Sequence, residues 1–152
     1  MKLAEALLLR SDIQKKLASL QDRAKKYTLV QENEKPAEDP NELLRQIDVV
    51  SSELEKLIYA INKANLNHSL KSGQPLTEAL AKRDVLVLRH SIIVGVANAC
   101  ARPPDRYGIK EIRWVATVNV AELRKKADDL AKQIRELNAA IQEVNWQIDL
   151  DI

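Results

Sequence analysis

The residues best suited to chemistry stand together around a rigid, proline-containing loop. They are Arg102, Asp105, Arg106, Tyr107, Arg113 and Trp114. Guanidinium groups beside aromatic rings suit protein interfaces, anionic ligands and stacked bases alike. We expect an interface or structural role for this cluster, with an anion site as the alternative. Arg106, Tyr107, Arg113 and Trp114 are therefore candidate interface residues.

Motifs of enzymatic chemistry are absent from the sequence, which has no Gly-rich phosphate loop, metal-ligand spacing or nucleophile elbow. Asp128 and Asp129 fall on the outer faces of an expected helix, where a solvated role is the ordinary one. His90 has no second His or Cys at ligand spacing. We therefore predict a protein that is not an enzyme, with no catalytic residue, cofactor or metal.

The charge balance and the cysteine count restrict the partners and the compartment. The 24 basic and 22 acidic side chains leave a net charge of +2, too small to make nucleic acid or an anionic membrane an obligatory partner. The single cysteine, Cys100, excludes an internal disulfide framework and fits a reducing compartment. Glu5 interrupts the apolar N-terminal stretch that a signal peptide would need. These features predict a cytoplasmic protein.

The composition favours helix, because only 3 glycines and 5 prolines occur in 152 residues. That length predicts a single domain, residues 1–152. Asp39 followed by Pro40 is a typical helix start. Apolar periodicity predicts four long helices, at about 2–27, 40–66, 77–101 and 120–149.

The last of these helices carries the most regular repeat. Its apolar residues recur at alternating four- and three-residue steps: Leu123, Ala127, Leu130, Ile134, Leu137, Ile141, Val144 and Ile148. Small or neutral residues flank this repeat where a parallel zipper would carry charges, so we expect antiparallel packing within a bundle. Trp146 falls at an outward position and is a further candidate for a subunit interface.

Apolar residues occupy several faces of the helix expected at 77–101. They include Val85, Leu86, Val87, Leu88, Ile92, Ile93, Val94 and Val96. A helix that is apolar all round is typically buried. Because Arg89 and His90 interrupt the apolar run, we interpret it as the central helix of a bundle or as a subunit contact, and not as a membrane segment.

Two short segments are predicted to be β-strands. Residues 111–118 place apolar side chains at every second position, and residues 28–33 are rich in β-formers. An isolated ribbon is marginal in water, so a pair of these strands must lie on the helices or on a second subunit. The predicted fold is thus mainly α: an antiparallel bundle of four long helices with coiled-coil-like seams and a small two-stranded β-ribbon.

Three blocks of the sequence resemble a known family. They are DPNELLR at 39–45, LTEALAKRD at 76–84, and EIRWVATVNV at 111–120 with its continuation to Asn145 and Trp146. Together they resemble the septicolysin-like family of small, largely uncharacterised bacterial helical proteins over nearly the whole chain. The resemblance implies a helical fold and a bacterial origin, and the family name implies a pore-forming cytolysin.

Three functional hypotheses follow. The leading one is a non-enzymatic cytoplasmic interaction or scaffold protein that self-assembles through its long helices as a dimer or larger homo-oligomer, with room for an unknown protein partner. The second, from the family resemblance, is a pore-forming cytolysin that inserts residues 85–101 into a membrane. The third is an anion or nucleic-acid binder that uses Arg102, Arg106 and Arg113.

Overall fold

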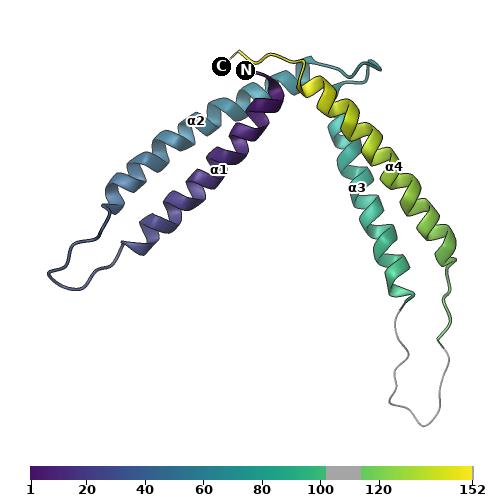
Figure 1. Ribbon diagram of the computed structural model, residues 1–152, viewed down its shortest axis with the longest axis horizontal. Helices are drawn as coiled ribbons and strands as arrows, with labels where there is room; N and C mark the ends of the chain where they lie inside the picture. Colours follow the sequence, from purple (N-terminus) through teal and green to yellow (C-terminus); the bar gives the residue numbers. More distant parts are fainter. Residues whose placement is uncertain (102–113, 152) are drawn as a thin grey trace, which may run out of the picture. The chain divides into compact units, whose positions relative to one another are not determined.

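The computed structural model describes residues 1–101 and 114–151 of the chain. Its helices are α1 (Leu3–Lys26), α2 (Pro40–Asn67), α3 (Leu76–Ala99) and α4 (Val120–Asn145), as shown in Figure 1. The predicted mainly helical fold with four long helices is therefore confirmed, and most helix ends lie within two residues of the expected positions.

The chain divides into two compact units. The first contains residues Met1–Pro75 together with Gln142–Ile152, and the second contains residues Leu76–Ile141. The first unit holds α1, α2 and the C-terminal end of α4, whereas the second holds α3 and the rest of α4. The single domain expected from the chain length, residues 1–152, stays a prediction.

In the first unit, α1 and α2 form an antiparallel hairpin and lie alongside each other (Figure 1). Its core includes Leu20 and Ala24 of α1 and Leu43 and Val50 of α2, all buried. The second helix begins as its sequence indicates: the carboxylate of Asp39 accepts a hydrogen bond from the Asn41 amide over 2.9 Å, with proline in the first helical position.

An ion pair joins α1 to the segment that leads into α2. Arg23 Nε donates a hydrogen bond to Glu38 Oε2 over 3.0 Å, and Arg23 Nη2 donates to the other oxygen, Oε1. This bidentate hydrogen bonding holds the pKa of Glu38 below its ordinary value and raises the pKa of Arg23.

We expect the pKa of Glu38 to rise toward the ordinary glutamate range in an Arg23→Ala variant, because the largest cause of its depression is removed. Since the folded state has the lower pKa, the pair stabilises the fold above the ordinary glutamate range, and its contribution disappears as the pH falls through the lowered pKa. Carboxyl titration by NMR measures the shift. Lys15→Ala, which removes an α1 lysine paired with Asp12, is the control and should leave Glu38 unchanged.

The C-terminal tail closes the first unit against the start of α1. The Leu3 amide donates to the Ile148 carbonyl over 2.9 Å, and the Leu150 amide donates to the Met1 carbonyl over 2.8 Å. Lys2 Nζ lies 2.8 Å from the Asp149 carboxylate, a hydrogen bond that lowers the pKa of Asp149. These backbone pairings explain why α4 ends at Asn145 and not at 149: the last residues leave the helix to hydrogen-bond with the N-terminus.

In the second unit, α3 and α4 run in opposite directions, as Figure 1 shows. The repeat predicted for α4 turns inward over its whole length. Ala127, Leu130, Ile141, Val144 and Ile148 are buried, and Leu123, Ile134 and Leu137 are half-buried. The structure thus confirms that this repeat is a packing seam, although Ile148 contributes to it from beyond the end of the helix.

The predicted β-ribbon is wrong in the part of the chain that the structure describes. Residues 28–33 are irregular: the Gln31 carbonyl accepts a hydrogen bond from the amide of Glu34, just after the segment, and Asn33 has a left-handed backbone with φ of 68°. Residues 114–118 are also irregular, and 111–113 lie outside the described residues. The β-formers at 28–33 and the alternation at 114–118 did not produce strands, because neither described segment has a neighbouring strand to complete its hydrogen bonds.

Candidate protein-interaction site

A second apolar repeat lies on the solvent-facing side of α3. It comprises six apolar or small residues at alternating four- and three-residue steps, all exposed: Ala81, Val85, Leu88, Ile92, Gly95 and Ala99. We call this set the outer seam. Val85, Leu88 and Ile92 expose 55%, 59% and 54% of their surface. A Cβ atom built on Gly95 would meet nothing within 4 Å, which shows that the seam is open there as well.

The opposite side of the same helix is covered. Leu76, Ala79, Leu86 and Ala97 are buried, with His90 half-buried among them. Both stripes follow the spacing that keeps residues on one face of a helix, so α3 has two apolar faces about half a turn apart. The expectation that an all-round apolar helix is buried is therefore wrong for the outer seam, which no described residue of the chain covers. The four- and three-residue steps of the outer seam are visible in the sequence and could have indicated this second apolar face.

The outer face of α4 provides an internal comparison. Its residues there are charged and exposed, among them Arg124, Lys125, Asp128, Asp129, Lys132, Arg135 and Glu136. In contrast, no charged residue occurs in α3 between His90 and its end. Exposed aliphatic side chains without interspersed charge are typical of surfaces that meet another protein. The outer seam is thus a property of α3 that the outer face of α4 does not share.

Charged residues flank the outer seam, and two of them, Asp84 and Arg89, lie beside its central residues. Asp84 bonds to its sequence neighbour, with Arg83 Nη2 lying 2.7 Å from the carboxylate, and its own side chain is 69% exposed. The Arg89 side chain makes no ion pair or hydrogen bond with any described residue. Both side chains are therefore placed to interact with a partner that covers the seam.

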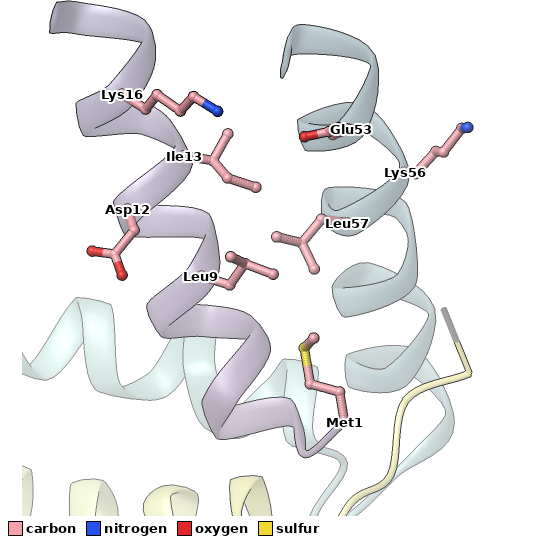
Figure 2. A pocket seen from close by; sticks show the side chains of 8 residues that line it. All are labelled: Met1, Leu9, Asp12, Ile13, Lys16, Glu53, Lys56 and Leu57. Atoms are coloured by element: carbon pink, nitrogen blue, oxygen red, sulfur yellow. The ribbon is translucent and has the colours of Figure 1, made fainter. Parts of the chain in front are cut away.

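A groove between α1 and α2 is a second candidate surface, with a volume of about 470 Å³. Figure 2 shows Leu9 and Ile13 of α1 and Leu57 of α2 pointing into the space between the helices, with Met1 at one end. The charged residues around it are two acids and two bases: Asp12, Glu53, Lys16 and Lys56. Because these charges balance, the groove selects neither an anionic nor a cationic ligand.

The interface residues predicted from the sequence are only partly placed. Arg106, Tyr107 and Arg113 lie outside the described residues, as do Arg102 and Asp105, so the cluster that suggested an interface or an anion site is not described as a whole. Trp114 belongs to the second unit and is 72% exposed, and Trp146 belongs to the first unit and is 53% exposed. The expected outward position of Trp146 is confirmed, although the residue lies just beyond the end of α4.

Neither a metal cluster nor a membrane span is found within residues 1–101 and 114–151. No group of three or more His, Cys, Asp or Glu side chains in these residues is arranged to hold a metal ion. No helix in the same residues is both long enough and apolar enough to cross a membrane, α3 included.

Comparisons with known proteins identify relatives but no activity. Residues 10–150 match the model of a family described as "Family of unknown function (DUF6847)". The chain is 36% identical to a functionally unknown conserved protein from Corynebacterium diphtheriae, whose crystal structure superimposes with a TM-score of 0.92 over 99% of each chain. No curated protein matches the sequence.

These matches correct the resemblance proposed from the three sequence blocks. The family that covers residues 10–150 is not a septicolysin-like family, and the matching crystal structure has no such description. The septicolysin-like assignment is therefore wrong. The blocks at 39–45 and 76–84 instead contain the starts of α2 and α3, where helix-start residues recur in unrelated proteins for the same physical reason.

Proposed function

Because the chain belongs to this family of unknown function, we propose its function from its own surface: it is a non-enzymatic interaction or scaffold protein that self-assembles through its long helices. The outer seam of α3 is the observation that carries the proposal. A helix that must only pair with α4 needs one apolar stripe, and α3 has two. The second stripe is accounted for if another helix packs on it.

A second copy of the chain is the partner that the seam favours. The seam offers an uncharged aliphatic surface, so a matching partner must present the same kind of surface. The outer face of α3 in another copy does so by definition, and symmetric dimers are the commonest assemblies of soluble proteins. The small net charge of +2 opposes such self-association only weakly.

The cytoplasm is the compartment we propose, from the single cysteine and the mixed charge of the chain. Cys100 is half-buried at the end of α3, and its thiol lies 3.5 Å from the Val96 carbonyl. A single, half-buried cysteine of this kind fits a reducing environment, where thiols do not form disulfides.

Sedimentation equilibrium of the full chain tests self-assembly. We expect the weight-average mass to rise from that of one chain, 17.2 kDa, toward that of a dimer as the concentration rises from low micromolar toward millimolar. The increase should be reversible on dilution, because the seam is a surface that is already folded in the free chain. A mass that stays at 17.2 kDa across this range would contradict the proposal.

A further inference from the structure

We propose that two copies pair through their outer seams as a parallel, two-stranded coiled coil along α3, flanked by ion pairs between Asp84 of each copy and the partner's Arg89. This inference rests on the proposed self-assembly and adds its geometry. Three properties of the described residues support it: the residue types at the seam positions, the charges beside the seam, and the size of the surface.

The residue types at the seam positions favour a parallel pair. In a seven-residue repeat lettered a to g, Val85, Ile92 and Ala99 take the a positions, and Ala81, Leu88 and Gly95 take the d positions. β-Branched residues at a with leucine at d favour parallel two-stranded coils, and Val85, Leu88 and Ile92 form one such stretch. All three side chains are more than half exposed in the free chain and are available to a partner.

The flanking charges are complementary only in the parallel orientation. Asp84 occupies a g position and Arg89 the following e position, five residues later. Residues in this relation face each other across a parallel coil, so the two-fold symmetry makes the Asp84–Arg89 pair twice. In an antiparallel pair centred on the seam, Arg89 would instead face the partner's Arg89, and like charges there are unfavourable. Because the Arg89 side chain bonds to none of the residues that the structure describes, it breaks no described contact when it forms the parallel pair.

The size of the seam predicts a weak, reversible dimer. From Ala81 to Ala99 the helix advances about 27 Å at roughly 1.5 Å per residue. Aliphatic side chains that each bury roughly 60–120 Å² give on the order of 500 Å² per copy, because the residues at both ends are small. The total of about 1,000 Å² lies below the ~1,200 Å² at which stable interfaces begin. We therefore expect a dissociation constant of roughly tens to hundreds of micromolar for the dimer.

A charge swap in the full-length protein tests the flanking pairs. Asp84→Arg alone or Arg89→Asp alone places like charges across the coil, and each should weaken the dimer about tenfold by sedimentation equilibrium at low salt. The double variant restores opposite charges and should return to within about threefold of wild type. Because both side chains are exposed, circular dichroism should show unchanged helicity. A double variant that dissociates as readily as the single variants would overturn the parallel pairing.

Oxidative cross-linking tests the orientation directly. In a Cys100→Ser background, Leu88→Cys brings identical d positions together in a parallel pair and should give a disulfide-linked dimer. Ser91→Cys is the matched comparison, because two copies of residue 91 approach each other only in the antiparallel pair centred on the seam. A dimer that cross-links through Ser91→Cys but not through Leu88→Cys would overturn this geometry and leave self-assembly standing. A wild-type chain that never associates would overturn both proposals.

Discussion

Replacing Leu88 by aspartate is expected to abolish self-association and to leave the fold intact. Leu88 lies at the centre of the outer seam and exposes 59% of its surface in the free chain, so the change costs the monomer little. In the assembled form, the same position carries a buried carboxylate with no cation opposite it, and an unpaired buried charge is strongly unfavourable. The dissociation constant should increase at least about 100-fold, equivalent to roughly 2.7 kcal/mol.

Sedimentation equilibrium measures this change, and thermal denaturation followed by circular dichroism reports the fold. The matched control is Ala139→Asp, which adds the same charge to an exposed position on α4, away from the outer seam. The control should associate like wild type. If Leu88→Asp and Ala139→Asp weakened association equally, net charge and not the seam would control assembly. If Leu88→Asp associated like wild type, the outer seam would not be the contact.

Replacing Ile61 by alanine should produce a large loss of stability in the first unit. Ile61 lies in α2, is only 1% exposed, and is among the largest fully buried side chains of the chain. Removing its outer carbons sacrifices their burial and leaves a cavity, which together cost about 2–5 kcal/mol in helical cores. We expect a lower urea midpoint, measured by circular dichroism with the Leu88→Asp background to keep the chain monomeric.

Tyr59→Ala provides the comparison for that measurement. Tyr59 lies two residues earlier on the same helix, but 69% of its surface is exposed, so its truncation should change the unfolding free energy by no more than about 0.5 kcal/mol. A similar destabilisation by both variants would mean that helix propensity, and not core packing, determines the stability of α2. A stable Ile61→Ala protein would contradict the burial of this side chain.

Local sequence signals predicted the helices well because helix starts and packing stripes depend on nearby residues. Asp39 and Pro40 begin α2 as expected, and the repeat from Leu123 to Val144 turns inward. The strand predicted at 28–33 is wrong, because a strand requires a partner elsewhere in the chain, and the presence of β-formers cannot show whether one exists.

The end of α4 depended on tertiary contacts. The apolar repeat continues through Ile148, so the sequence predicted helix to residue 149. In the structure, helix ends at Asn145 because the Ile148 carbonyl and the Leu150 amide hydrogen-bond to the N-terminal residues. Ile148 is buried although it lies beyond the helix, so the apolar repeat alone could not locate the end of the helix.

For the candidate site, the sequence by itself determined that α3 is apolar on more than one face and that Asp84 and Arg89 flank one of those faces. Only the tertiary structure decided which face is covered, because both stripes have the same helical spacing and nothing local distinguishes them. In the folded chain the stripe that contains Leu86 is buried, whereas Leu88 and the rest of the outer seam lie in solvent. The tertiary fold thus determines which of the two apolar faces of α3 is exposed to solvent.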